Sequence, residues 1–293
     1  MRVVRYMMAG VKRGLGLHSP GRSLLILPDD VFLVSFPKSG NTWARFLLSN
    51  LLHSDQQVTF ANLHRFTLDL TGGASKRAFD RAPRPRIIKS HECFDPRYPR
   101  VIYIVRDPRD VAISLYHYHR KRRKIEDDSP LDSFVARFLT GEAFGNASWG
   151  QNALTWLASR EGDPQFLLLR YEDMITDAAR ELRKVAAFLG VNPTAEQITR
   201  AVERSSAGQM RKMEQEQSEQ SGLTKGFRKD IPFVRRAGTG GWRSELPPPL
   251  VAKIEAAWAP LMKHLGYELT TRDVSALEGF PLLALAGASG ARK

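Results

Sequence analysis

The chain has 293 residues, of which 42% are hydrophobic, so it is long enough to bury the core of one sizeable α/β domain. Its 44 Lys and Arg residues against 31 Asp and Glu residues give a formal net charge of +13. This excess points to an anionic ligand, a nucleic acid or a membrane surface, and charge alone does not choose among them. Cys93 is the only cysteine, which excludes an intrachain disulfide framework and a cysteine-based metal cluster.

The two ends of the chain lack a pattern typical of membrane insertion. Residues 1–20 are basic and partly apolar, but Arg5, Lys12 and Arg13 interrupt any run long enough for the core of a signal peptide. We expect an arm or edge helix there, with a weak peripheral membrane contact as the alternative. No segment approaches the ~18 uncharged apolar residues of a membrane-spanning helix. The sequence predicts a soluble, cytoplasmic protein with a basic arm (1–25), one domain (26–267) and a C-terminal tail (268–293).

A strand, a tight turn and a helix are expected near the start of the domain. Residues 31–36 are mostly apolar and predict a strand, and residues 43–52 carry apolar side chains at helical spacing. The turn between them is rich in hydroxyl groups and contains Lys38. Unpaired backbone N–H groups, the helix dipole and the lysine charge all favour an anion. A phosphate or sulfate would fit this turn, although an ordinary strand–turn–helix junction has the same pattern.

Further strands alternate with helices along the chain. Such alternation implies crossover connections and a parallel sheet, whose ligands bind at the carboxyl ends of the strands. Asp107 and Pro108 are suited to begin the helix after the third strand. Residues 205–242 lack a clear period, and we interpret them as a functional loop. The remaining expected strands are 86–89, 101–105 and 166–169, and the later expected helices are 131–139, 149–157, 178–189, 195–203 and 248–265.

Four polar clusters follow one another at the ends of these elements. They are FPKSGNTW at 36–43, KSH at 89–91, RDPRDVAIS at 106–114 and RRAGTGGW at 235–242. Together they resemble the cytosolic-type sulfotransferases, and we expect a bacterial member. The resemblance implies a single P-loop-like α/β domain with a central parallel sheet flanked by helices. It also implies transfer of a sulfuryl group from 3′-phosphoadenosine 5′-phosphosulfate (PAPS) to a hydroxyl group of a small-molecule, lipid or glycoside acceptor.

The same resemblance assigns residues to the donor nucleotide. The first loop would hold the 5′-phosphosulfate, with Trp43 beside the adenine. Arg106, Ser114 and the late arginine pair would grip the 3′-phosphate. The matched positions are Lys38, Ser39, Gly40, Asn41, Thr42, Trp43, Arg106, Ser114, Tyr171, Ser205, Arg235, Arg236 and Ala237.

Three positions depart from the family pattern. Arg236 replaces a lysine and keeps the charge, whereas Ala237 replaces a glycine and restricts the backbone. Ala207 stands where similar enzymes often place an aromatic ring against the adenine. We therefore expect a looser grip on the 3′-phosphate and an adenine stacked from one side.

Sulfuryl transfer resembles phosphoryl transfer in requiring in-line attack by an oxygen, so position and electrostatics dominate. We expect Lys38 to stabilise the leaving oxygen and His91 to act as general base. Lys89, on the same side of its strand, would stabilise the transferring group. Glu92 is the competing base, because similar Golgi-type carbohydrate enzymes use a glutamate, but adjacent strand residues point to opposite faces. The scheme requires no metal.

Two histidines of the third motif's helix and three other functions have to be considered beside this hypothesis. His117 and His119 do not share a helical face, so we interpret them as acceptor-pocket lining or surface. A nucleotide kinase would need a lysine after the second glycine of its loop and acidic Mg²⁺ ligands, which the pattern lacks. A binding protein for nucleic acid or anionic glycan suits the charge, but aromatic residues are not interleaved with the basic run. A degenerate sulfotransferase is disfavoured by Lys38, His91 and Ser114. We expect a hydroxylated acceptor and no nucleic acid; acceptor identity and oligomeric state stay open.

Overall fold

Parallel strands form the central sheet, as predicted. The computed structural model describes residues 23–70, 74–145, 147–217, 219 and 224–271. Within these residues the sheet has five strands in the order β2-β3-β1-β4-β5, and every neighbouring pair is parallel. The strands are β1 (Val31–Ser35), β2 (Leu68–Asp69), β3 (Ile87–Ser90), β4 (Arg100–Val105) and β5 (Phe166–Arg170).

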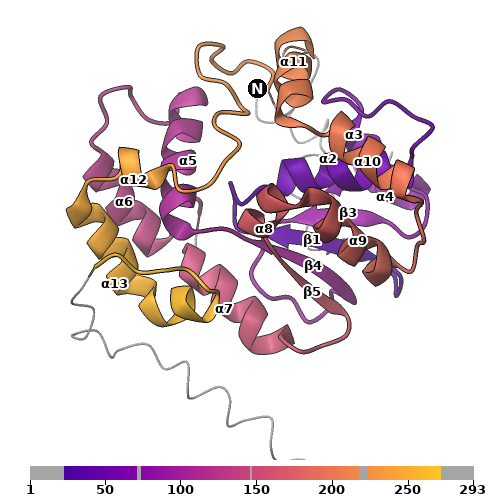
Figure 1. Cartoon of the computed structure of the whole chain (residues 1–293), viewed down its shortest axis with the longest axis horizontal. Helices are drawn as coiled ribbons and strands as arrows, with labels where there is room; N and C mark the ends of the chain where they lie inside the picture. Colours follow the sequence, from indigo (N-terminus) through magenta and orange to yellow (C-terminus); the bar gives the residue numbers. More distant parts are fainter. Residues whose placement is uncertain (1–22, 71–73, 146, 218, 220–223, 272–293) are drawn as a thin grey trace, which may run out of the picture.

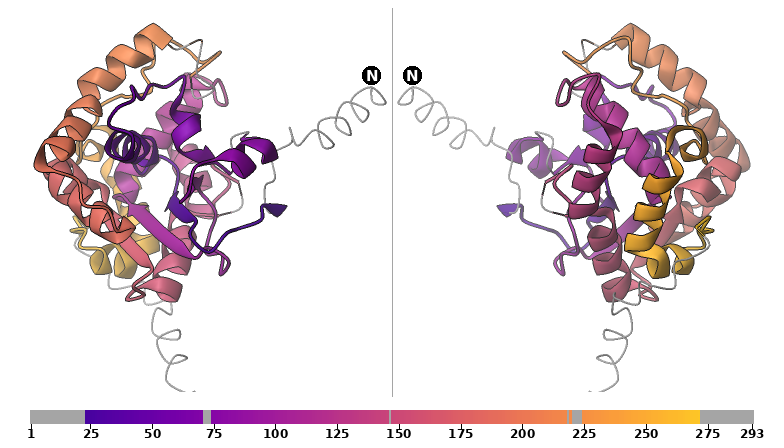
Figure 2. Two further views of the ribbon diagram at one scale, coloured as in Figure 1. Left: turned by 90° about the vertical axis from the view of Figure 1, so that its right-hand side faces the viewer. Right: turned by 90° about the vertical axis from the view of Figure 1, so that its left-hand side faces the viewer.

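Helices cover both faces of this sheet (Figures 1 and 2). Successive strand residues point to opposite faces, so β1 contributes Phe32 and Val34 to one core and Val31 and Leu33 to the other. The first core is completed by α5 (Pro108–Lys121), α6 (Leu131–Thr140), α7 (Trp149–Arg160) and α13 (Pro248–His264), and the second by α2 (Asn41–Leu52), α8 (Tyr171–Thr176), α9 (Ala178–Leu189) and α10 (Ala195–Arg204).

The strand order places the first loop at a topological switch point. β1 is the central strand, with β3 on one side and β4 on the other. Because all strands are parallel, the loops that follow them meet at one edge of the sheet, and ligands of such sheets bind where the order reverses. The clusters after β1, β3, β4 and β5 are therefore brought together.

The start of α5 follows from local sequence, as predicted. The Asp107 side chain accepts a hydrogen bond from the Arg109 N–H, and Pro108 occupies the first turn, where its missing N–H costs nothing. This cap fixes the direction in which α5 leaves β4.

The polar segment 205–242 contains a helix that the sequence did not reveal. α11 (Ala207–Gln217) buries Met210, Met213 and Glu214 and leaves most of its other side chains at the surface. Two methionines are the only large apolar side chains among its eleven residues, too few for a period to be detected. The short elements α3 (Leu63–Phe66), α4 (Lys76–Arg81) and α12 (Trp242–Glu245) were not predicted either.

The ends of the chain remain outside this description. The expected arm at 1–25 and tail at 268–293 lie almost wholly outside the described residues. Among the helices that are described, none combines the length and the apolar character needed to cross a membrane.

Candidate active site

The loop between β1 and α2 has the shape of an anion-binding turn. Lys38 and Gly40 both have positive φ, 69° and 96°. A side chain at Gly40 would place its Cβ 2.5 Å from the ring of Tyr171. Only glycine therefore satisfies both the backbone and the contact. The N–H groups in the first turn of α2 have no partner within the helix, as at any helix N-terminus.

Two polar atoms in this loop are buried without a partner. The Ser39 hydroxyl and the Asn41 Oδ1 atom make no hydrogen bond to any described residue. Asn41 Nδ2 instead donates to the Leu33 carbonyl and the Ser35 hydroxyl, both at 3.2 Å. A buried hydroxyl without a partner is costly unless a ligand supplies one. Ser39 therefore fits a phosphate or sulfate oxygen.

Lys38 is held between two aromatic rings. Its Nζ atom lies 4.5 Å from the ring centre of Tyr118 and 4.8 Å from that of Phe233. Burial, and then the charges of Arg106 and Arg235, lower the pKa of Lys38 to about 7. A bound anion would reverse this effect. Lys38 opens on a small cavity of about 20 Å³ lined by Ser114, His117, Tyr118, Lys121, Pro232, Phe233 and Arg235.

Arg106 joins the first loop, between β1 and α2, to the late loop, which we define as residues 233–241, before α12. Its guanidinium donates to the carbonyls of Lys38 at 3.2 Å and Gly238 at 3.0 Å. It also stacks over the ring of Tyr171 at 4.3 Å, and its Nε atom has no partner among the described residues. Segments about two hundred residues apart in the chain thus contact one guanidinium group. Three further residues predicted for the site, Lys38, Ser114 and Arg235, line the cavity.

Helix α11 holds the backbone of the arginine loop. Arg211 donates to the carbonyls of Val234, Arg235 and Arg236, at 3.0, 2.9 and 3.3 Å. Glu214 accepts from the N–H groups of Phe233 at 2.6 Å and Val234 at 3.1 Å. The sequence did not identify either residue, because their partners are backbone atoms of a loop without a motif. The spacing of three, which puts both on one helical face, was the available signal.

Asp110 anchors the glycine-rich turn that follows. Its carboxylate accepts from the N–H groups of Gly240 at 2.8 Å and Trp242 at 3.0 Å. Trp242 in turn lies 3.9 Å below the guanidinium of Arg109. Asp110 belongs to the motif at 106–114, but the sequence assigned it no role. It connects α5 to the late loop and so fixes where the arginine pair emerges.

His91 lies beside the first loop, on the neighbouring strand. Its Nδ1 atom is 2.7 Å from the Ser35 carbonyl. Because a carbonyl only accepts, Nδ1 carries the proton and Nε2 keeps a free lone pair. Burial, and then the charge of Lys89, lower the pKa of His91 to about 3. The ring is therefore neutral at physiological pH, with the lone pair of Nε2 unprotonated.

Lys89 does not stand alone on β3. Its Nζ atom donates to Asp69 Oδ2 at 2.9 Å, and β2 and β3 pair these two residues in register. Burial lowers the pKa of Lys89, and Asp69 opposes that shift. The sequence missed Asp69 because β2 has two residues and no period. The competing base Glu92 is tied through its carbonyl to Asn152 and Trp156 of α7.

The residues expected near the adenine lie on several different elements. Trp43 and Tyr171 meet edge to face, with ring centres 5.9 Å apart. Ser205 is fully buried, and its hydroxyl accepts from Asn50 Nδ2 at 3.0 Å. Ala207 begins α11. Ala237, which replaces the family's glycine, adopts a positive φ of 52°.

The two histidines of α5 have different surroundings. His117 lines the cavity, with Nε2 2.8 Å from Glu245. His119 is buried against Phe134, and burial lowers the pKa of His119 to about 4. In the part of the chain that the structure describes, no group of three or more His, Cys, Asp or Glu side chains is arranged to hold a metal ion.

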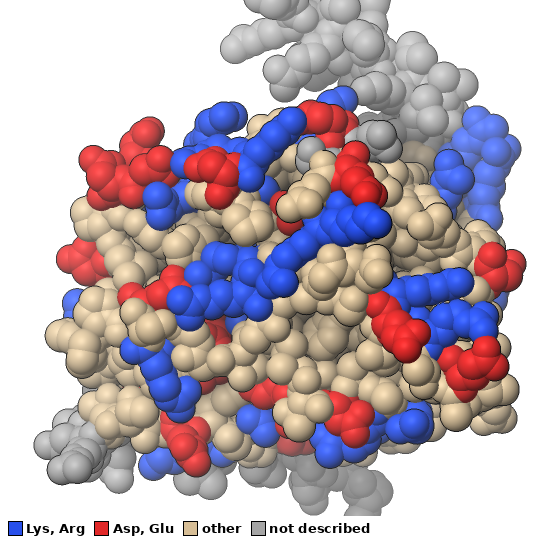
Figure 3. All heavy atoms as spheres, turned by 45° about the horizontal axis from the view of Figure 1, so that its top comes forward, with Lys and Arg blue, Asp and Glu red and all other residues tan. Residues whose placement is uncertain are grey.

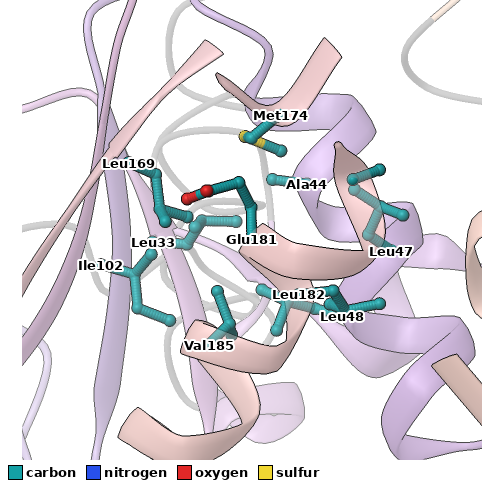
Figure 4. A pocket seen from close by; sticks show the side chains of 11 residues that line it. Leu33, Ala44, Leu47, Leu48, Ile102, Leu169, Met174, Glu181, Leu182 and Val185 are labelled. Carbon is teal, nitrogen blue, oxygen red and sulfur yellow. The ribbon is translucent and has the colours of Figure 1, made fainter. Parts of the chain in front are cut away.

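A second pocket lies in the apolar core between the sheet and helices α2 and α9 (Figure 4). Its volume of about 10 Å³ is at the lower limit for one water molecule. The carboxylate near it, Glu181, is bound by Arg180 and Lys184. This pocket is a packing void rather than a ligand site.

On the face drawn in Figure 3, Lys and Arg side chains form a band, and Asp and Glu side chains lie along it. This face therefore carries charges of both signs.

Known proteins with similar sequences were compared with this chain. Sulfotransferase 1A1 of Bos taurus is 28% identical over 240 residues, which covers 77% of this chain and 80% of the relative. Sulfotransferase 2B1 of Mus musculus is 29% identical over 215 residues, covering 68% and 62%. The amine sulfotransferase of Oryctolagus cuniculus is 26% identical over 233 residues, covering 75% and 76%.

Two solved structures share the fold. Retinol dehydratase in a complex with retinol and PAP has a TM-score of 0.69 at 20% identity, covering 83% of this chain and 84% of that one. Mouse sulfotransferase SULT7A1 complexed with PAP has a TM-score of 0.64 at 23% identity, covering 85% and 89%. The family model described as the sulfotransferase domain matches residues 28–266, most of the chain. The protein therefore belongs to the sulfotransferase family.

Proposed function

We propose that this protein transfers a sulfuryl group from PAPS to a hydroxyl group of a small-molecule acceptor, in the cytoplasm, through one domain at 26–267. The observation that carries the proposal is the convergence on one cavity of Lys38, Ser114 and Arg235, with Arg106 joining their loops. Relatives solved with PAP support the choice of nucleotide. The buried Ser39 hydroxyl without a protein partner fits a donor oxygen.

The donor carries a 5′-phosphosulfate and a separate 3′-phosphate, and the protein must bind both. We assign the 5′ side to the first loop and the 3′-phosphate to Arg106, Ser114 and the arginine pair. Trp43 and Tyr171 offer ring faces and edges for the adenine. The residues proposed to hold the donor are Lys38, Ser39, Gly40, Asn41, Thr42, Trp43, Arg106, Ser114, Tyr171, Ser205, Arg235, Arg236 and Ala237.

In the proposed mechanism, His91 Nε2 accepts the proton of the acceptor hydroxyl as its oxygen bonds to sulfur. The bond from sulfur to the leaving phosphate oxygen breaks in the same step. Lys38 and the loop N–H groups stabilise the charge on that oxygen, as preorganised donors do in other transfer reactions. Lys89, held by Asp69, stabilises the transferring group. This scheme assigns no role to a metal.

The choice between His91 and Glu92 as base is testable by substitution. His91→Ala should lower turnover by ~10²–10⁴, because a positioned base contributes about that factor, while PAP binding stays within about twofold. Glu92→Gln is the matched control, since it changes the neighbouring residue and should leave turnover largely intact. Turnover is measured by sulfuryl transfer to a panel of phenols and alcohols, and PAP binding by calorimetry. Loss of turnover in Glu92→Gln but not in His91→Ala would reverse the assignment.

A further inference from the structure

The arginine pair proposed for the 3′-phosphate already binds an anion, which is a carboxylate of the chain itself. Glu245, at the end of α12, accepts a hydrogen bond from Arg235 at 2.7 Å. The Nε atom of Arg236 is 3.3 Å from the same carboxylate oxygen. The other oxygen of Glu245 is 2.8 Å from His117 Nε2. One side chain thus contacts both arginines of the proposed donor site and His117, which lines the same cavity.

This carboxylate is charged and largely shielded. The Glu245 side chain is 18% exposed, against 26% for Arg235. Burial alone would raise the pKa of Glu245, but the hydrogen bonds from Arg235 and His117 lower it on balance. Arg120 is the other charged group near His117. At neutral pH the positive charge of Arg235 is therefore offset before any ligand arrives.

We propose that Glu245 competes with the donor's 3′-phosphate for Arg235 and Arg236, and so determines the affinity for PAPS and the rate at which PAP leaves. The proposal rests on the proposed function of the site.

The direction of the effect follows from charge. A phosphate carries a charge of about −1.5 to −2 at pH 7. It must approach guanidinium groups that lie 2.7 Å and 3.3 Å from the Glu245 carboxylate. Unit charges about 4 Å apart change a binding constant by about fivefold even in bulk water, and by more near a protein surface. Removing the carboxylate charge should therefore tighten binding of the 3′-phosphate.

The test compares two nucleotides that differ at one group. PAP has a 3′-phosphate and 5′-AMP lacks it. Calorimetry on the full chain should show that Glu245→Gln binds PAP about three- to tenfold tighter and 5′-AMP within about twofold of wild type. The PAP dissociation rate, followed by stopped-flow fluorescence, should fall by the same factor, since affinity changes at one site appear mainly in dissociation.

Two controls separate this effect from a general change in charge. Glu161→Gln removes the same charge from another His–Glu pair, with His264 at 2.9 Å, and should leave both affinities unchanged. In a chain that carries Arg235→Ala and Arg236→Ala, Glu245→Gln should have no effect on PAP. Thermal unfolding verifies that each variant folds, and Glu245→Ser replaces the glutamine variant if that one is unstable.

Several results would overturn the proposed role of Glu245. Unchanged PAP binding in Glu245→Gln overturns the proposal, because the carboxylate then has no effect on the 3′-phosphate. Weaker PAP binding overturns it too, because Glu245 then holds the arginines in a position that favours binding. Equal tightening for PAP and 5′-AMP overturns it as well. A wild-type chain that binds neither nucleotide removes the proposed function and this inference together, whereas wild-type PAP binding that Glu245→Gln leaves unaltered removes only the role of Glu245.

Discussion

Ala237 is the residue whose replacement gives the clearest test of the late loop. It has a positive φ of 52°, in the region where an L-residue with a Cβ atom costs about 1–2 kcal/mol relative to glycine. The strain persists because the backbone is held from both sides. Arg211 binds the carbonyl of Arg236, and Asp110 binds the N–H group of Gly240. Ala237→Gly should relieve the strain without loss of these contacts.

The expected increase in the free energy of unfolding is smaller than the backbone strain at Ala237. Glycine gives the unfolded chain more freedom, which costs about 0.4–1 kcal/mol of stability. The difference leaves a net increase of about 0.5–1 kcal/mol in the free energy of unfolding. For a chain of this size that corresponds to a rise of about 1–4 °C in the melting temperature.

The matched control is an alanine in an ordinary conformation. Ala82 has φ −65° and ψ 142°, so Ala82→Gly brings only the entropic cost and should lower stability by about 0.4–1 kcal/mol. Urea denaturation of the ligand-free chain measures both variants. The two substitutions should therefore have opposite signs. If Ala237→Gly destabilises the protein as much as Ala82→Gly does, residue 237 is not held at positive φ in solution, and the account of the loop is wrong.

Two further predictions concern the residues around the proposed base. Asp69 opposes the lowering of the Lys89 pKa by burial. Asp69→Asn should therefore lower the pKa of Lys89 further and move the alkaline limb of the turnover–pH profile to lower pH. Asp80→Asn, which breaks the exposed pair with Lys76, is the control, and an alkaline limb that does not move in Asp69→Asn would contradict the role of Lys89. The pKa of His91 is about 3 in the folded protein and ordinarily 6.5. Between these two pH values the His91 side chain is protonated in the unfolded chain but not in the folded one. The free energy of unfolding is therefore unaffected by His91 above pH 6.5 and decreases as the pH falls below 6.5. His91→Gln should flatten this decline by up to about 1.4 kcal/mol per pH unit, measured by urea denaturation from about pH 7 to pH 4.5.

The sequence was sufficient for those parts of the site that depend on neighbours along the chain or on the order of parallel strands. The strand, turn and helix around Lys38 follow from local pattern. The position of His91 follows from the strand it ends, since β3 pairs with β1. Asp107 and Pro108 begin α5 as their residue types require. Each of these predictions needed only a period or a cap.

The remaining parts depend on contacts between distant segments. Asp110 binds Gly240 across 130 positions, and Arg106 binds Gly238 across 132. Glu245 and Asp69 are single carboxylates in short elements without a motif, and no local rule identifies their partners. Helix α11 was missed for a related reason, because Met210 and Met213 are its only large apolar side chains, and Arg211 and Glu214 on the same helix bind the backbone of a distant loop.

The three principal cations of the site are compensated in three different ways. Lys38 lies between aromatic rings, Arg106 donates to backbone carbonyls and lies 3.8 Å from Asp110, and Arg235 binds Glu245 at 2.7 Å. An arriving phosphate can add to the interactions with rings and carbonyls, which carry no net charge, and Asp110 already accepts hydrogen bonds from the N–H groups of Gly240 and Trp242. The phosphate can bind Arg235 fully only by sharing it with an anion or displacing one. Of the two carboxylates, Glu245 lies closer to its arginine, at 2.7 Å against 3.8 Å for Asp110. The larger electrostatic penalty for binding the donor should therefore arise at Glu245, where a single isosteric substitution removes the charge.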